Sequence, residues 1–136
     1  MACLDTTFLV DLAGGGGKAR CARAATKLRA LIARGDLLCT TRFNVAELHV
    51  GVYRSHDPEA ETKAVEALLT GIAILEFGSR EARVFGQLTA HLQKLGRPAG
   101  DMDVLIAATA LTAGHVLVSD NASHFAGIPE LVVETY

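Results

Sequence analysis

The sequence has little that would mark a secreted, membrane-spanning or thiolate-metal protein. Its three cysteines, Cys3, Cys21 and Cys39, lie far apart and form no CxxC pair, so we expect reduced, buried thiols in a cytoplasmic protein. No apolar run is long enough to cross a bilayer. The first ten residues lack the basic region of a signal peptide, and we expect none. The five histidines show no ligand spacing and are interpreted as ordinary surface or core residues.

What the chain does have is length, apolar content and an uneven charge distribution. Its 136 residues, half of them apolar, predict one domain that spans residues 1–136. The net charge of −2 does not indicate nucleic-acid binding by itself, but residues 18–34 contain six basic residues and no acid. On the predicted helix, Arg20, Arg23 and Lys27 form a basic stripe. That stripe is either a solvated helix face or a contact for RNA phosphates or a protein partner.

Apolar strand patterns alternate with amphipathic helix patterns along the whole chain. The strands are predicted at residues 2–5, 37–40, 72–76, 116–118 and 131–134, and the helices at residues 6–12, 18–34, 42–54, 57–70, 79–95 and 101–113. This alternation indicates an α/β fold with a short parallel sheet of four to five strands and helices on both faces. Gly14–Gly17 lacks the Lys-Ser/Thr of a phosphate-binding loop and is interpreted as a flexible turn.

Several acidic residues fall where a sheet of this kind binds its ligands, outside the carboxyl ends of the strands. Asp5 ends the first strand, and Asp120-Asn121 follows the strand at 116–118. Asp101 and Asp103 open an otherwise apolar helix, and Glu47 lies among apolar helical neighbours. Each acid also has a simpler explanation. Asp5 and Asp101 could cap helices, and Thr6 or Thr7 is the other candidate cap for the first helix. Asp103 could be placed in the first turn because the helix dipole favours an acid there, and Asp120-Asn121 could form a turn.

Oxygen ligands without histidine or cysteine suit a hard cation such as Mg²⁺ or Mn²⁺. A carboxylate-held Mg²⁺ commonly takes phosphate oxygens as further ligands and can promote attack of water on phosphorus. The convergence of the acids, rather than any single one, therefore predicts metal-dependent phosphate chemistry.

The ordered set of motifs resembles the PIN-domain ribonucleases, and most closely the VapC-type toxins of prokaryotic toxin–antitoxin pairs. The motifs are Leu4-Asp5-Thr6-Thr7-Phe8-Leu9-Val10-Asp11-Leu12, Val45-Ala46-Glu47-Leu48-His49-Val50-Gly51, Asp103-Val104-Leu105-Ile106-Ala107-Ala108 and Leu117-Val118-Ser119-Asp120-Asn121-Ala122-Ser123-His124-Phe125. Each motif alone is weak, but together they span almost the whole chain in the order that the family shows.

The resemblance implies a PIN-like three-layer sandwich and a Mg²⁺- or Mn²⁺-dependent endoribonuclease that leaves 5′-phosphate and 3′-hydroxyl ends. The residues that match the catalytic positions are Asp5, Glu47, Asp103 and Asn121, with Asp5 and Asp103 as metal ligands and Thr6, Ser119, Asp101 and Asp120 as supporting residues. The chain departs from the family at the fourth acid, where Asn121 stands and Asp120 precedes it. This departure puts a second firmly held metal ion in doubt. The resemblance further implies an RNA substrate, a cognate antitoxin and a homodimer.

Three other functions are compatible with parts of the pattern. A haloacid-dehalogenase-like phosphatase needs Asp-x-Asp after the first strand, whereas Asp5 is followed by two threonines. A phosphoryl-accepting receiver domain needs a lysine after a late strand, and residues 116–136 contain none. A catalytically silent PIN-like module that binds RNA or protein remains the non-enzymatic alternative.

Overall fold

Five short parallel strands form a single sheet at the centre of the protein. A computed structural model describes all 136 residues. The strands are β1 (Ala2–Leu4), β2 (Leu38–Thr41), β3 (Ala73–Leu75), β4 (Val116–Val118) and β5 (Val133–Glu134), and they lie in the order β3-β2-β1-β4-β5 with every pair parallel. Because the order reverses at β1, the carboxyl ends of β2, β1 and β4 meet at the middle of one sheet edge.

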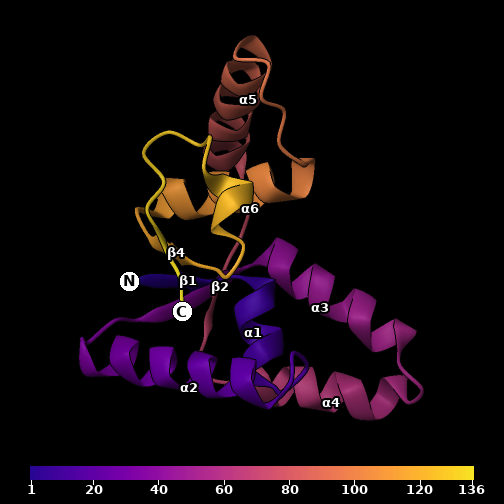
Figure 1. The fold of residues 1–136 in the computed structure, drawn as a ribbon. Coiled ribbons are helices and arrows are strands. Elements are labelled where there is room, and N and C mark those ends of the chain that lie inside the picture. The colour runs from indigo at the N-terminus through magenta and orange to yellow at the C-terminus, as the bar shows by residue number, and fades with distance from the viewer.

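Helices cover both faces of this sheet, as the sequence predicts (Figure 1). Helices α1 (Thr6–Leu12), α2 (Lys18–Ala33), α3 (Arg42–Arg54) and α4 (Pro58–Leu68) lie on one side, and α5 (Ser79–Lys94) and α6 (Asp101–Ala113) lie on the other. A short 3₁₀ helix, η1 (Ala122–Phe125), follows β4. None of the helices combines the length and the apolar character needed to span a bilayer.

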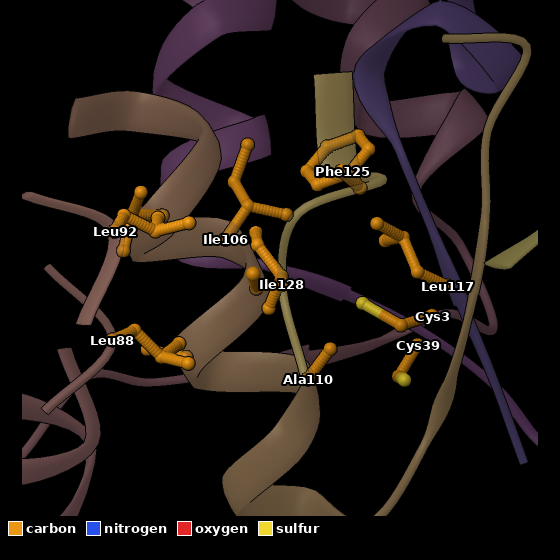
Figure 2. Close-up of a cluster of buried hydrophobic side chains, with 12 residues drawn as sticks. Cys3, Cys39, Leu88, Leu92, Ile106, Ala110, Leu117, Phe125 and Ile128 are labelled. Atoms are coloured by element: carbon orange, nitrogen blue, oxygen red, sulfur yellow. The ribbon is translucent and has the colours of Figure 1, made fainter. Parts of the chain in front are cut away.

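The three central strands, β1, β2 and β4, contribute side chains to two separate apolar clusters, because successive residues of a strand point to opposite faces. In β1, Ala2 and Leu4 pack with helices α1–α4, whereas Cys3 packs with α5 and α6. Figure 2 shows the second cluster, where Leu88 and Leu92 of α5 and Ile106 and Ala110 of α6 face Cys3, Cys39 and Leu117. Burial on both faces holds the sheet edge that carries the acids between two packed layers.

Two helix starts differ from the sequence prediction, and the structure decides a third, for which the sequence offered two candidate caps. Asp5, rather than Thr6 or Thr7, caps α1, because its carboxylate accepts the backbone N–H of Thr6 at 2.8 Å. Gly100, rather than Asp101, is the N-cap of α6, so Asp101 is the first helical residue and is exposed. Gly78, rather than Ser79, precedes α5 and is held by Glu81. The predicted cap at Thr41 is confirmed, and Asn44 completes a reciprocal capping pair with it.

The glycine turn before α2 has a packing role that the sequence interpretation missed. A Cβ on Gly16 would overlap the Asp11 carboxylate and lie 3.0 Å from the Arg20 side chain. The chain therefore passes close over the ion pair between Asp11 and Arg20, a path that needs a residue without a side chain.

We expect Gly16→Ala to destabilise the protein by about 1–3 kcal/mol, because the new methyl group forces the ion pair beneath it to move. Urea denaturation would measure the change. Gly86→Ala is the matched control, since no atom lies within 4 Å of its added Cβ within α5, and it should stabilise the helix by about 0.5–1 kcal/mol. Equal effects of the two substitutions would contradict the packing role.

Candidate functional site

The carboxyl ends of the central strands and the helices that follow them enclose one polar pocket. Its volume is about 390 Å³, and we call it the acid pocket. It is lined by Asp5, Thr6, Thr7, Val10, Glu47, Asp103, Asn121 and His124. The structure therefore brings together all four residues that match the catalytic positions, Asp5, Glu47, Asp103 and Asn121, although they are spread over 117 positions of the chain.

Asp5 is the best-held acid of the pocket. It is 6% exposed, and its Oδ1 accepts from the backbone N–H of Thr6 at 2.8 Å and from Asn44 Nδ2 at 3.0 Å. Its Oδ2 accepts from the hydroxyls of Thr7 at 3.1 Å and Ser119 at 2.6 Å. These four donors use the whole acceptor capacity of a carboxylate and fix its orientation at the end of β1.

Glu47 lies on α3, and its position follows from the cap at Thr41 that starts this helix where β2 ends. Thr6 Oγ1 donates to Glu47 Oε1 at 2.7 Å and in turn accepts from Asn44 Nδ2 at 2.9 Å. Burial raises the pKa of Glu47, the hydrogen bond from Thr6 lowers it, and the charges of Asp5 and Asp103 raise it further. Glu47 thus carries a charge that its own surroundings disfavour.

Asp103 faces the pocket from the first turn of α6. Burial raises its pKa, the charge of His124 lowers it, and the charge of Asp5 raises it. His124 Nδ1 lies 3.6 Å from Asp103 Oδ2 and is its one ion-pair partner when protonated. The pocket therefore has an excess of negative charge that favours a cation.

Asn121 and Asp120 follow β4 but serve different places. Asn121 Nδ2 donates to Thr7 Oγ1 at 3.2 Å, and its backbone N–H donates to Ser119 Oγ at 3.0 Å, which ties it to the donors of Asp5. Asp120 instead pairs with Arg20 at 2.8 Å and does not line the acid pocket. The exposed Asp101 does not line the acid pocket either. It is the first residue of α6, two positions before Asp103.

A second polar cluster lies beneath the glycine turn, away from the acid pocket. Asp11 is 2% exposed, and its carboxylate accepts from Arg20 Nε at 3.0 Å and from the Tyr136 hydroxyl at 2.7 Å. Burial and the hydrogen bond to Asp11 raise the pKa of Tyr136, so this hydroxyl remains a donor. Arg20 also binds Asp120, and the cluster thereby joins α1, α2, the turn after β4 and the last residue of the chain.

These contacts change the interpretation of the basic stripe on α2. Arg20 is held by Asp11 and Asp120, and Lys27 is held by Glu134 at 2.7 Å. Only Arg23 of the three has no carboxylate partner within the chain, and it is exposed. Arg20 and Lys27 therefore have structural roles, and contact of the stripe with RNA or an antitoxin stays a prediction.

Sequence reasoning missed three residues of the pocket's surroundings: Asn44, Thr7 and His124. Asn44 could have been found from its place three residues after the Thr41 cap, where a reciprocal capping side chain is expected. Thr7 and His124 carried no comparable signal. Thr7 and His124 reach the pocket because of the direction in which α1 leaves β1 and the direction in which the turn after β4 enters η1. Only the tertiary structure defines these two directions.

The donor atoms of the acid pocket fit a divalent cation. The pocket offers carboxylate and amide oxygens, which Mg²⁺ and Mn²⁺ prefer. No three Asp, Glu, His or Cys side chains of the protein converge on one metal position. This arrangement suits an ion that keeps several waters or takes substrate phosphate as ligand, rather than one held in a closed protein cage.

The raised pKa of Glu47 predicts a stability effect with a definite sign. Because the folded protein binds this proton more tightly than the unfolded chain, ionised Glu47 lowers stability once the pH exceeds its ordinary pKa of 4.5. We expect metal-free Glu47→Gln to unfold at a higher temperature than the original protein at pH 7, with the difference vanishing near pH 4.

Scanning calorimetry at several pH values would test this expectation. Glu76→Gln is the control of opposite sign, because Arg42 holds the pKa of Glu76 below its usual value and its charge is therefore favourable in the folded state. A lower unfolding temperature for Glu47→Gln at pH 7 would show that the acid pocket does not disfavour this charge.

Comparisons with known proteins agree with this geometry. Residues 2–131 match the PIN domain family. Ribonuclease VapC2 of Haemophilus influenzae is 34% identical over 99 residues, which are 73% of this chain and 75% of that protein. Ribonuclease VapC19 of Mycobacterium tuberculosis is 31% identical over 131 residues, 96% of this chain and 97% of its own.

Solved structures give the same result at the level of the whole fold. The crystal structure of VapBC2 from Rickettsia felis bound to a DNA fragment from the promoter superimposes with a TM-score of 0.87 at 25% identity, covering 99% of this chain and 98% of that chain. The expected three-layer α/β sandwich is thereby confirmed. The chain belongs to the PIN-domain family, and within it to the VapC ribonucleases.

Proposed function

We propose that this protein is a divalent-metal-dependent endoribonuclease and the toxin of a toxin–antitoxin pair. The observation that carries the proposal is the acid pocket, which Asp5, Glu47, Asp103 and Asn121 line and in which no lysine or arginine neutralises the acids. The relatives named ribonucleases, among them a tRNA(fMet)-specific endonuclease VapC of Salmonella typhimurium that is 30% identical over 99 residues, support RNA as the substrate class.

In this mechanism Asp5 and Asp103 would hold Mg²⁺ or Mn²⁺. When bound, the ion would polarise the scissile phosphate and offset charge that develops in the transition state. All four acceptor positions of Asp5 are occupied by donors, so a cation requires one of them to turn away. The Thr7 hydroxyl forms the longest of these hydrogen bonds, at 3.1 Å, and is the donor that we expect to be released.

Glu47 and Asn121 serve the attacking water. Glu47 has a raised pKa and one oxygen held by Thr6, which leaves its other oxygen free to accept a proton from water. Asn121 follows the carboxyl end of β4, lines the same pocket and can orient the same water through its amide. Attack on phosphorus with departure of the 3′-oxygen leaves 5′-phosphate and 3′-hydroxyl ends.

A cleavage assay tests the proposal. The purified protein should cleave RNA with Mg²⁺ or Mn²⁺, stop when EDTA is added, and recover when the metal is restored in excess. Analysis of the product ends should find 5′-phosphates. Cleavage that continues in EDTA would indicate a contaminating nuclease, and no cleavage of any RNA class would favour the catalytically silent binding module.

A surface beside the glycine turn supports the proposed protein partners. The groove between α1, α3 and α4 measures about 410 Å³ and is lined mainly by apolar residues. Val10, Val50 and Tyr53 are 38%, 51% and 76% exposed on the helices around it. Exposed apolar side chains of this size are typical of protein interfaces, and we propose that this region receives an antitoxin segment or a second copy of the chain. Light scattering with and without the antitoxin would distinguish the two.

A further inference from the structure

A larger cavity adjoins the acid pocket on its outer side. It measures about 450 Å³ and lies between the end of α5, the loop at 95–100, the start of α6 and η1. Asp103 and His124 line both this cavity and the acid pocket. The two spaces therefore share a wall formed by these two residues, and we call the larger one the outer cavity.

The walls of the outer cavity combine an apolar interior with a polar rim. Leu92 and Ile128 are 2% and 5% exposed, so they form its apolar inner surface. Pro98 adds an apolar edge, while His124 and Ser123 are exposed at the rim. An apolar surface with a few polar groups at its edge is what a nucleobase requires, since its faces stack and its edges form hydrogen bonds.

Arg97 gives the outer cavity the cation that the acid pocket lacks. It is the only lysine or arginine that lines either space. Arg20, Arg34 and Arg42 are all paired with carboxylates, whereas Arg97 has no carboxylate partner within the chain. A free guanidinium beside a group of acids offsets the repulsion that RNA phosphates meet there, and its planar face can stack on a base.

We propose that the outer cavity is the subsite for the base of a nucleotide next to the scissile phosphate, with Arg97 at its rim. This inference rests on the proposed ribonuclease function, because the acid pocket defines where the scissile phosphate lies. A base that enters the outer cavity holds the RNA chain so that the neighbouring phosphate passes Asp103 and His124. The residues around the cavity would then set which nucleotide is preferred at the cleavage site.

Binding of mononucleotides tests the subsite without any cleavage. The probes are AMP, CMP, GMP and UMP, added to ¹⁵N-labelled Asp5→Asn protein without metal, with ribose 5-phosphate as the probe that lacks a base. We expect nucleotides to shift the amide signals of Arg97, Ser123 and Ile128 and ribose 5-phosphate to leave them unchanged. Equal shifts with ribose 5-phosphate, or none with any nucleotide, would overturn the proposal.

Cleavage of modified RNA tests the same subsite in the reaction. An RNA oligonucleotide that the protein cleaves is synthesised as a series of variants, each with an abasic residue at a different position. We expect kcat/KM to fall about tenfold or more at one position beside the cleaved bond, as when one stacked base is lost. Ala126→Trp, which fills the cavity from an exposed wall position, should lower cleavage of intact RNA similarly and remove the sensitivity to the abasic residue.

Arg97→Ala provides a second variant in case the filled cavity disturbs folding. It should raise KM more than it lowers kcat, whereas Arg83→Ala, an equal loss of charge at an exposed position on α5, should change neither. If cleavage requires metal but no abasic position changes its kcat/KM, the proposed subsite is wrong and the proposed ribonuclease function is retained. Absence of cleavage would refute the proposed function, while the mononucleotide shifts would still decide the subsite.

Discussion

Replacing Asp5 by asparagine should lower RNA cleavage by at least about a hundredfold, because the substitution removes the charge that holds the cation and keeps the shape of the side chain. The structure indicates why the fold should survive. Oδ1 remains an acceptor for Thr6 and Asn44, and the new amide can donate to the hydroxyls of Thr7 and Ser119, which also accept.

The comparison with alanine makes this experiment sharper. Asp5→Ala would leave the buried donors of Asn44 and Ser119 without an acceptor and should unfold at a lower urea concentration than Asp5→Asn. Single-turnover cleavage and urea denaturation measure the two effects separately. If Asp5→Asn retains full activity at saturating Mg²⁺, the proposed metal ligation by Asp5 is wrong.

The second large effect, a loss of both stability and cleavage, is expected when Asn44 is replaced. This residue is fully buried and connects the cap of α3 to the acid pocket. Its Oδ1 accepts from the Thr41 hydroxyl at 2.6 Å, and its Nδ2 donates to Asp5 and Thr6. Asn44→Ala removes the capping side chain and leaves buried partners unpaired, which should cost about 2–4 kcal/mol of unfolding free energy. Cleavage should fall as well, since Asp5 loses one of its donors.

Asn44→Asp separates these two roles. The new carboxylate can still accept from Thr41, so the cap of α3 is kept, but it places a negative charge where the amide donated to Asp5 at 3.0 Å. We expect a larger loss of cleavage relative to the loss of stability than in Asn44→Ala. Parallel measurement of urea midpoints and cleavage rates would check the ratio, and an identical ratio in both variants would mean that Asn44 acts on the site only through the fold.

Much of the architecture could be predicted from the order of residue patterns. The strand at 116–118 has the predicted bounds, and the other strands shift by one or two residues. The misplaced starts of α5 and α6, and the start of α1 that the sequence left open, all lie where several capping residues stand side by side. At such places the local sequence offers alternative hydrogen bonds of similar strength, and the path of the preceding strand or loop selects one of them.

The candidate site was harder to predict at its supporting residues than at its acids. Asp5 and Asp103 follow from their places at a strand end and a helix start, and Glu47 follows from its apolar helical neighbours. Asn44 and Thr7 do not follow in this way. Asn44 holds Asp5 only when β1 and β2 lie side by side, and Thr7 reaches Asp5 only through the turn from β1 into α1. The same holds for His124, which reaches Asp103 only through the turn after β4.

The sequence by itself determined that carboxylates stand at the carboxyl ends of parallel strands, because strand periodicity and chain order are local properties. The tertiary structure decided which of these side chains enter the acid pocket. Asp120 forms an ion pair with Arg20, a residue one hundred positions earlier, and stays outside the acid pocket. Its neighbour Asn121 donates a hydrogen bond to Thr7 and lines the pocket. Side-chain direction at a turn is set by such distant partners, and no local pattern records them.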